Sequence, residues 1–254
     1  MIHAEHIAFA YDRQKVIDAI SFELQKGDVC AIMGLNGSGK STLVKLIAGL
    51  LPVQEGRLLI DHLPINEYPR KQLAQQIAYV PQQQDIVFDF SVYDIVMMGR
   101  NPYQSRWETE NEADREIVHQ VLQQCNLFHL KDRMLTQLSG GEKQRTLIAR
   151  AMAQQAPVML LDEPLSNLDI IHKYEIMDIL ANLNRTKQIT TLIILHDFPF
   201  AKQYATKSLL LKEGQLCHFG DTHKTLVPEI IRETFNLSKD YQIDELGNVV
   251  KGKG

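Results

Sequence analysis

Cysteine is scarce in this chain of 254 residues, with single cysteines at positions 30, 125 and 217. They are odd in number, far apart and without the close spacing of metal ligands, so they indicate no cysteine metal site. Cys30 stands in an apolar run and is expected in the core. A reducing cytoplasm is the natural setting for such a chain.

Long apolar runs are also missing. No segment approaches the roughly 20 apolar residues that span a bilayer, and the longest runs, such as residues 192–195, have the length of buried strands. The first residues lack the basic and then apolar plan of a signal peptide. If the protein works at a membrane, we expect another chain to supply the membrane part.

Neither sign of charge is in large excess. Lys and Arg number 27 against 31 Asp and Glu, which gives a formal net charge of −4, and the two kinds are interspersed. This argues against a nucleic-acid-binding face, where clustered basic residues are typical. Residues 251–254 form a loose basic tail that we expect to be solvated. The sequence shows no internal repeat or low-complexity segment, and its length suits a single α/β domain.

Short strands are predicted along much of the chain. Residues 2–9 and 20–24 alternate apolar and polar side chains, as half-buried antiparallel strands do. Further strands are predicted at 29–33, 58–60, 77–80, 158–161 and 191–195, with hairpins at 208–219 and near Gly247. Strands that alternate with helices indicate a parallel sheet.

Strand signals are missing between Val92 and Gln155. Helices are predicted there at 92–98, 110–124 and 141–154, and another follows at 170–184. This pattern indicates a helical insertion in an α/β core. We therefore predict one domain over 1–254, with a catalytic core at 1–85 and 157–225, a helical subdomain at 86–156 and a C-terminal extension at 226–254.

A phosphate-binding loop is predicted at residues 34–41, which read Gly-Leu-Asn-Gly-Ser-Gly-Lys-Ser and fit the pattern G-x-x-x-x-G-K-[ST]. The loop follows a predicted strand and opens a helix. Its glycines allow the backbone to curl around phosphate oxygens. Lys40 supplies charge to the terminal phosphates, and Ser41 offers a hydroxyl to Mg²⁺. Taken alone, the loop predicts that some nucleoside triphosphate binds.

Two carboxylates, Asp162 and Glu163, follow the predicted strand at 158–161. An apolar strand that ends in an acid places a carboxylate at the sheet edge where α/β proteins bind ligands. We expect Asp162 to hold Mg²⁺ through water and Glu163 to act as the general base that polarises the attacking water. Two solvated charges in a strand–helix turn are the alternative.

A second turn suited to an anion lies at residues 138–144, which read Leu-Ser-Gly-Gly-Glu-Lys-Gln. A Ser-Gly-Gly-Glu turn that opens a helix offers backbone N–H groups to a negative charge. Together with the phosphate loop, it resembles the ATP-binding-cassette (ABC) ATPases, whose signature is similar to LSGGQ; Lys143 stands where Arg is common. The resemblance implies a homodimer, because in that family each turn faces ATP held by a second copy.

The resemblance covers nearly the whole chain and implies an α/β fold of the P-loop NTPase (RecA-like) class. This fold has a mixed sheet core, antiparallel N-terminal strands and an inserted helical subdomain. Residues 166–169, Ser-Asn-Leu-Asp, resemble the family's D-loop, with Asn167 where Ala is commoner. Helix capping by Ser166 or Asp169 is an alternative role for these residues.

Three further residues take roles from the resemblance. His196 follows a strand late in the chain and corresponds to the switch histidine that reads the γ-phosphate. Gln82 stands in the family's Q-loop context, where an amide touches the metal or water. Tyr11 matches the aromatic that stacks on adenine, although an aromatic at a strand end is also common in plain packing.

The expected site residues fall into four groups. Catalysis is assigned to Glu163, His196 and Gln82. Nucleotide binding is assigned to Tyr11, Gly34, Asn36, Gly37, Ser38, Gly39, Lys40, Ser41 and Thr42. Contacts to the ATP of the second chain are assigned to Ser139, Gly140, Gly141, Glu142 and Asp169. Mg²⁺ is assigned to Ser41, Gln82 and Asp162. The expected cofactors are thus ATP and Mg²⁺.

A local likeness narrows the class. Residues 94–103 resemble a stretch of the ATPases that drive importers of metal chelates such as siderophores, haem, cobalamin or molybdate. This implies a subunit on the cytoplasmic face of the inner membrane, with integral permease subunits and an extracytoplasmic solute-binding protein as partners and no nucleic acid. The expected docking residues are Met97, Met98, Arg100 and Tyr103, taken to be exposed. A helix end, capped by Gly99 and stopped by Pro102, is the alternative reading of the segment.

Two other functions stay open. An ATPase of a metal-ion or other-solute transporter would share every catalytic residue. A non-transport ABC ATPase acting on DNA or ribosomes is disfavoured, because such proteins usually carry a long coiled coil or two cassettes in one chain.

Overall fold

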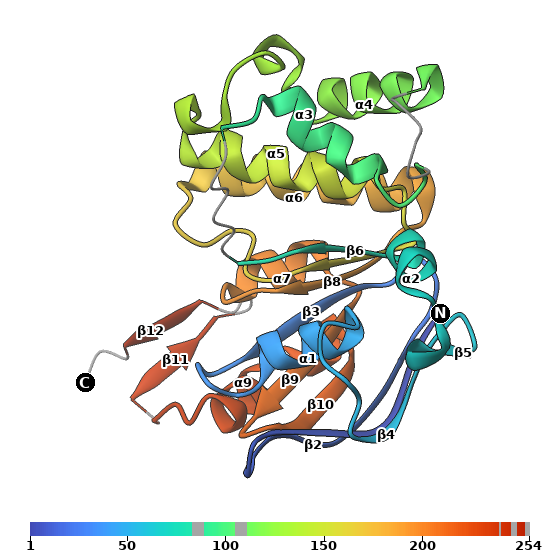
Figure 1. Cartoon of the computed structure of the whole chain (residues 1–254). Coiled ribbons are helices and arrows are strands. Elements are labelled where there is room, and N and C mark those ends of the chain that lie inside the picture. The colour runs from blue at the N-terminus through green and yellow to red at the C-terminus, as the bar shows by residue number, and fades with distance from the viewer. Residues whose placement is uncertain (83–88, 105–110, 239, 245–247, 252–254) are drawn as a thin grey trace. The chain divides into compact units, whose positions relative to one another are not determined.

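The computed structural model describes the chain except for residues 83–88, 105–110, 239, 245–247 and 252–254. The chain forms two compact units. The first unit combines Met1–Tyr68 with Thr190–Gly254, and the second is Pro69–Ile189. Figure 1 shows the helices and strands of both units.

An antiparallel sheet makes up one part of the first unit. Its strands are β1 (Ile2–Tyr11), β2 (Gln14–Leu24), β4 (Glu55–Ile60) and β5 (Leu63–Pro64), in the order β2-β1-β4-β5. Ile2 and Ala4 of β1 are buried, whereas His3 and Glu5 are exposed. The predicted alternation is thus confirmed for residues 2–5 of β1 and 20–24 of β2. It breaks over residues 6–9, where the pairing of β1 with β2 shifts register.

A mixed sheet makes up the other part of the first unit. Within it, β3 (Val29–Gly34) lies between β8 (Thr190–Ile194) and β9 (Lys207–Lys212) and is parallel to both. β10 (Gln215–Asp221) pairs antiparallel with β9 in the predicted hairpin. Nearly every residue of β3 and all of β8 are buried, as the apolar composition of parallel strands requires. The helices of this unit are α1 (Lys40–Ile47), α7 (Phe198–Tyr204), α8 (Thr222–Thr225) and α9 (Pro228–Thr234), with a 3₁₀ turn at Ile65–Glu67.

Helices dominate the second unit. They are α2 (Arg70–Gln76), α3 (Val92–Met97), α4 (Glu112–Gln124), α5 (Gly140–Ala153) and α6 (Ile170–Lys187), with 3₁₀ turns at Met98–Arg100, Phe128–Leu130 and Leu135–Gln137. Two parallel strands accompany them, β6 (Ile77–Val80) and β7 (Val158–Leu161). α3, α4 and α5 pack against one another. Each buries an apolar stripe at helical spacing, such as Val118, Val121 and Leu122 of α4.

A short antiparallel hairpin, β11 (Tyr241–Ile243) with β12 (Val249–Lys251), lies near the C-terminus. The hairpin predicted near Gly247 is thus confirmed, although Gly247 itself lies outside the described residues. The fold class is also confirmed, with mixed and antiparallel sheets and a helical segment between residues 92 and 155. The expected division into core 1–85 and 157–225, subdomain 86–156 and extension 226–254 stays a prediction.

The three cysteines differ in their surroundings. Cys30 on β3 and Cys125 after α4 are buried, whereas Cys217 on β10 is exposed. Burial raises the pKa of the Cys125 thiol to about 12 and that of Cys30 well above its ordinary value. The expectation that Cys30 lies in the core is confirmed.

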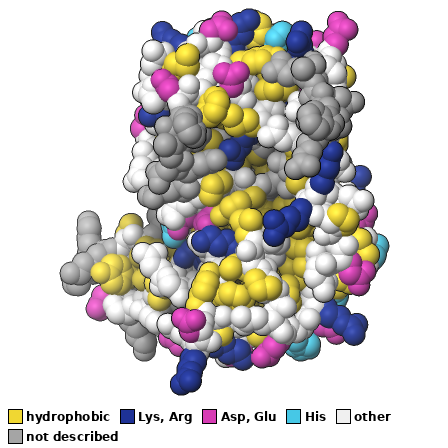
Figure 2. Space-filling view, viewed as in Figure 1, with side chains coloured by type: hydrophobic (Ala, Val, Ile, Leu, Met, Phe, Trp, Pro, Cys, Tyr) yellow, Lys and Arg dark blue, Asp and Glu magenta, His cyan; other side chains and the backbone are white. Residues whose placement is uncertain are grey.

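Two surface properties bear on the expected partners. Within the described part of the chain, no helix has the length and apolar character needed to cross a membrane. On the face drawn in Figure 2, acidic and basic side chains are mixed rather than gathered by sign.

Candidate functional site

The phosphate loop joins β3 to α1 in the first unit, as predicted (Figure 1). Inside the loop, the Ser38 N–H donates to the carbonyl oxygen of Leu35 at 3.1 Å. Gly39 caps α1 with a φ of 99°, a left-handed conformation that favours glycine. A Cβ at this position would also lie 2.8 Å from the carbonyl oxygen of Val16. Both the backbone and the available space therefore select glycine here.

Lys40 and Ser38 fit a phosphate group. The Lys40 side chain is buried, and its Nζ donates to the carbonyl oxygens of Gly34 at 3.1 Å and Leu35 at 3.0 Å. The Ser38 Oγ is also buried and has no hydrogen-bond partner among the described residues. A buried hydroxyl without a partner costs about 1–3 kcal/mol, and a phosphate oxygen next to it would remove that cost. The first N–H groups of α1 add further donors, because they have no partner inside the helix.

His196 follows the mixed sheet at the edge where the phosphate loop begins. β8 runs parallel to β3 with Ile194 paired to Ile32, and the Leu195 N–H donates to the Ile32 carbonyl oxygen at 3.2 Å. Since parallel strands end at the same edge, His196 follows β8 where Gly34 ends β3. Its side chain is exposed. The structure thus brings this predicted residue to the phosphate-loop edge of the first unit.

Tyr11 ends β1 in the first unit with 45% of its surface exposed. Its ring meets the ring of Phe9 edge to face, with centroids 4.8 Å apart. This contact is the packing alternative weighed above, yet it leaves much of the ring exposed. The stacking role of Tyr11 stays a prediction.

The predicted carboxylates lie together in the second unit with the predicted glutamine. The Asp162 N–H donates to the Val80 carbonyl oxygen at 2.9 Å, which continues the pairing of β6 and β7 beyond the strand end. Asp162 is buried, and Glu163 follows it with a φ of 50°. Gln82 donates from Nε2 to the Oε2 atom of Glu163 at 2.7 Å. Residues predicted from two separate motifs therefore form one polar cluster.

Tyr79 belongs to the same cluster and was considered only as sequence context for Gln82. Its hydroxyl donates to the Oδ2 atom of Asp162 at 3.4 Å. Desolvation and the nearby Asp162 carboxylate raise the pKa of Tyr79 to about 12, so the hydroxyl keeps its proton as a donor. A signal was available, because β6 and β7 are paired strands and a polar atom on one should face the acid that ends the other.

The signature turn opens α5 with a complete capping box. The Ser139 Oγ accepts from the Glu142 N–H at 3.3 Å, and a Glu142 carboxylate oxygen accepts from the Ser139 N–H at 2.8 Å. The hydrogen bond from the Ser139 N–H, followed by one from the Ser139 side chain, lowers the pKa of Glu142. Gly140 is open to its surroundings, whereas Gly141 is packed against the His172 ring.

Asp169 caps α6, as the alternative reading of this segment predicted. Its carboxylate accepts from the His172 N–H at 3.0 Å and from the His172 ring at 2.8 Å. The backbone hydrogen bond and then the ring hydrogen bond lower the pKa of Asp169. Asn167 has a φ of 60°, a left-handed conformation in which Asn is more stable than Ala. The departure from the family's commoner Ala thus has a backbone reason.

The structure corrects the expected exposure of the docking residues. Met97 and Arg100 are both 5% exposed, so the expectation that they form an exposed surface is wrong. The Arg100 guanidinium pairs with Asp114 at 2.7 Å and donates to the Ala153 carbonyl oxygen, also at 2.7 Å. It also lies over the Tyr103 ring at 4.1 Å. Tyr103 remains 38% exposed, and Met98 is half-buried.

A magnesium ion would need little from the protein. The described ranges contain no group of three or more His, Cys, Asp or Glu side chains that could hold a metal ion. Mg²⁺ bound with a nucleotide usually takes phosphate oxygens, waters and only one or two protein oxygens. The buried Asp162 carboxylate in the second unit and the Ser41 hydroxyl in the first unit each offer an oxygen of the kind that Mg²⁺ prefers.

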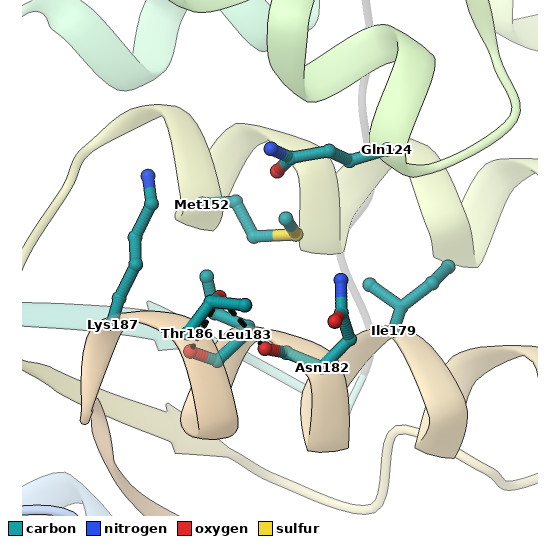
Figure 3. Close-up of a pocket in the computed structure, with 7 residues that line it drawn as sticks. All are labelled: Gln124, Met152, Ile179, Asn182, Leu183, Thr186 and Lys187. Carbon is teal, nitrogen blue, oxygen red and sulfur yellow. Dashed lines mark hydrogen bonds between the residues drawn. The ribbon is translucent and has the colours of Figure 1, made fainter.

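A cavity of about 240 Å³ lies elsewhere in the second unit, at the C-terminal ends of α4, α5 and α6 (Figure 3). Met152 and Leu183 contribute apolar surface, and Asn182, Thr186 and Lys187 contribute polar groups. Met152 is 13 residues beyond Ser139 on α5, which is about 20 Å along the helix. The cavity is therefore distant from the signature turn.

Comparison with known proteins agrees with these features. Residues 17–166 match the family model described as ABC transporter. The petrobactin import ATP-binding protein FpuC of Bacillus anthracis is 36% identical over 240 residues, which cover 94% of this chain and 88% of that protein.

Two solved structures are similar over most of the chain. One is an inward-facing conformation of a putative metal-chelate type ABC transporter, with a TM-score of 0.82, 33% identity and coverage of 93% of this chain and 89% of that chain. The other is a dimeric structure of a bacterial ABC transporter cassette, with a TM-score of 0.77, 27% identity and coverage of 87% and 99%.

Proposed function

Because this chain belongs to the ABC transporter family and is an ATPase of that family, we propose that it powers an importer of a metal chelate, with a siderophore as the leading candidate. The observation that carries the proposal is the match over nearly the full length to a petrobactin import ATP-binding protein. The likeness to a metal-chelate type transporter supports the same class.

In this proposal, ATP takes the place of the internal contacts of the phosphate loop. Lys40 turns from the carbonyl oxygens of Gly34 and Leu35 to the terminal phosphates, and the Ser38 hydroxyl gains the partner that it lacks among the described residues. Tyr11 stacks on the base, which gives little selectivity among bases. The remaining nucleotide contacts come from the loop and the start of α1, at Gly34, Asn36, Gly37, Gly39, Ser41 and Thr42.

Hydrolysis is assigned to the polar cluster and the switch histidine. Ser41, Gln82 and, through water, Asp162 would hold Mg²⁺. Glu163 polarises the attacking water as the general base, with Gln82 as the hydrogen-bond donor that orients its carboxylate. His196 reads the γ-phosphate, since a neutral imidazole both donates and accepts. Mg²⁺ supplies charge neutralisation of the phosphates when it is bound.

A second copy of the chain completes each site. Ser139, Gly140, Gly141, Glu142 and Asp169 of one chain face the ATP held by the other, so ATP joins two chains and hydrolysis lets them part. The dimeric cassette similar to this chain supports such an arrangement.

The dimer acts on a membrane partner in this proposal. Integral permease subunits bind at a surface that includes Met98 and Tyr103, and an extracytoplasmic protein delivers the solute. The chain is thus peripheral, on the cytoplasmic face of the inner membrane. We retain the division into core 1–85 and 157–225, subdomain 86–156 and extension 226–254 as part of the proposal.

Reconstitution tests the transported solute. Proteoliposomes that enclose ATP and contain the chain with its permease should take up a radioactive ferric siderophore when the solute-binding protein is outside. A Glu163→Gln chain in the same vesicles is the matched control and should transport almost none. Uptake of free metal ions in place of the ferric siderophore would favour the metal-ion or other-solute alternative, whereas uptake of haem, cobalamin or molybdate would keep the proposed class and change its leading solute. ATPase stimulation by nucleic acid, without transport, would favour the non-transport alternative.

A further inference from the structure

The N-terminal ends of α5 and α6 are joined by one side chain. In the proposed function, both ends contact the ATP that a second chain holds. Asp169 caps α6, and the signature turn opens α5. His172, in the first turn of α6, reaches both. Its Nδ1 lies 2.8 Å from each carboxylate oxygen of Asp169. The other side of its ring faces Gly141.

The His172 ring explains why position 141 is a glycine, because the ring occupies the space that a larger side chain would need. Gly141 has no left-handed backbone conformation that would call for glycine. A Cβ placed there would lie 2.2 Å from Cδ2 and 2.8 Å from Nε2 of the His172 ring. A Cβ on the neighbouring Gly140 would meet nothing within 4 Å. The space around Gly140 would therefore admit a side chain, whereas the absence of a side chain at Gly141 makes room for the imidazole.

The hydrogen bond fixes the ring as well. An ionised carboxylate only accepts hydrogen bonds, so Nδ1 must carry the proton and donate it to Asp169. The Asp169 side chain is 61% exposed and that of His172 is 29% exposed. A half-buried ring therefore anchors an exposed carboxylate that would otherwise sample several rotamers.

A second link lies one turn further along both helices. Arg145 of α5 forms an ion pair with Glu175 of α6. Arg145 follows Gly141 by four residues and Glu175 follows His172 by three, so each lies on the same face of its helix as the first contact. The helices are thus tied together at their N-terminal ends, whereas their C-terminal ends border the cavity of about 240 Å³ (Figure 3).

We propose that His172 is a positioning residue that joins the Asp169 carboxylate and the signature turn into one rigid element, so that both reach the nucleotide of a second chain together. This inference rests on the proposed two-chain site. The side chain acts through Asp169 and Gly141 and does not itself touch the nucleotide. Its loss leaves the Arg145–Glu175 pair as the remaining described link near these ends and frees the Asp169 carboxylate from the signature turn. ATP-dependent pairing of chains is then weakened, whereas ATP binding to one chain is not.

Substitutions can separate the two contacts of the ring. His172→Asn keeps an N–H donor near the Nδ1 position but removes the part of the ring that packs on Gly141. His172→Phe keeps an aromatic ring over Gly141 but removes the donor to Asp169. His172→Ala removes both. His119→Asn is the matched control, since His119 is a half-buried histidine of α4 in the same unit, with its ring against Tyr93 and Phe128.

The test measures pairing and binding separately, in a Glu163→Gln chain that retains ATP. Sedimentation with Mg-ATP gives the dissociation constant of the dimer, and a fluorescent ATP analogue gives the affinity of the single chain. Each His172 variant should raise the dimer dissociation constant at least about tenfold, which is about 1.4 kcal/mol. The affinity of the single chain for ATP and the behaviour of the His119 control should be unchanged.

Kinetics give an independent readout in chains with Glu163 intact. The His172 variants should lower kcat and leave the KM for ATP near that of the wild type. Wild-type pairing by either the Asn or the Phe variant would overturn the proposal, because one contact would then be dispensable. Equal losses of pairing and of single-chain ATP affinity would also overturn it, since they indicate general disruption. A parent Glu163→Gln chain that stays monomeric with ATP would contradict the two-chain site itself, whatever residue stands at position 172.

Discussion

Glu163 combines an unusual backbone with a specific neighbour. It has a φ of 50° directly after the buried strand β7, and Gln82 donates to its carboxylate at 2.7 Å. A left-handed residue of this type costs about 1–2 kcal/mol, and such residues concentrate at functional sites. The two neighbouring carboxylates therefore have different surroundings, since Asp162 is buried and Glu163 is half-buried against Gln82.

We predict that Glu163→Gln lowers the rate of ATP hydrolysis about 10²–10⁴-fold, the range typical of a lost general base. ATP binding should persist, because the phosphate loop is untouched. Phosphate release at saturating Mg-ATP measures the rate, and equilibrium dialysis measures binding. A mutant that hydrolyses ATP at near the wild-type rate would rule out Glu163 as the base.

The sequence predicted which residue types carry the chemistry but not which partners they have. Gln82 was identified separately from the adjacent pair Asp162 and Glu163, and the pairing of β6 with β7 brings them together. Tyr79 was passed over although its strand precedes Gln82 and pairs with the strand that ends at Asp162. His172 was missed because its contact with Gly141 arises only on folding. The sequence contained no sign that Gly141 is packed against a ring while Gly140 is open to its surroundings.

Arg100 and Asp114 connect elements of the second unit. Arg100 ends the 3₁₀ turn after α3, Asp114 lies in the first turn of α4, and Ala153 ends α5. The guanidinium joins all three and is almost completely buried. Removing one partner of a buried ion pair leaves the other charge without compensation.

We predict that Arg100→Ala lowers the free energy of unfolding by about 3–5 kcal/mol, as measured by urea denaturation. Tyr103→Ala, which removes only the exposed ring beneath the guanidinium, should cost about 0.5–1 kcal/mol. Tyr103→Ala should also spare the ATPase activity of the isolated chain and weaken its assembly with the permease. If Arg100→Ala is as stable as Tyr103→Ala, the ion pair contributes far less than its burial implies.

Elements were predicted better than contacts between elements. Val158–Leu161 matches β7 and Ile77–Val80 matches β6 without a shift, because short apolar runs between polar turns define buried strands. α6 runs to Lys187, beyond the predicted end at 184, since residues 185–187 contain neither Gly nor Pro and basic residues such as Arg185 and Lys187 suit the last turn of a helix. The predicted exposure of Arg100 was wrong, because its partners Asp114 and Ala153 lie 14 and 53 residues further along the chain.

On the scale of the whole molecule, the proposed site needs residues from two chains. Lys40 lies in the first unit and Ser139 in the second. If each Lys40 acts with the Ser139 of another chain, defects at these two positions should complement each other in a mixed pair.

We predict that Lys40→Ala chains mixed with Ser139→Arg chains form pairs with ATP, although neither variant does so alone. Such a pair keeps one intact site, made from the Ser139→Arg chain's phosphate loop and the Lys40→Ala chain's signature turn. Native mass spectrometry distinguishes the mixed pair from the two homodimers. Mixing Lys40→Ala with the Lys40→Ala/Ser139→Arg double mutant is the control, because no intact site can then form. Efficient pairing in that control, or by each single variant alone, would contradict the two-chain site.

The different surroundings of the three cysteines have a practical consequence. Cys30 and Cys125 are buried with raised thiol pKa values, whereas Cys217 is exposed on β10. Since the thiolate is the form that reacts, a maleimide dye should attach at Cys217 and spare the other two. The natural sequence thus provides a labelling site for one fluorophore per chain. Fluorescence anisotropy could then follow the joining and parting of chains through an ATP cycle without any engineered residue.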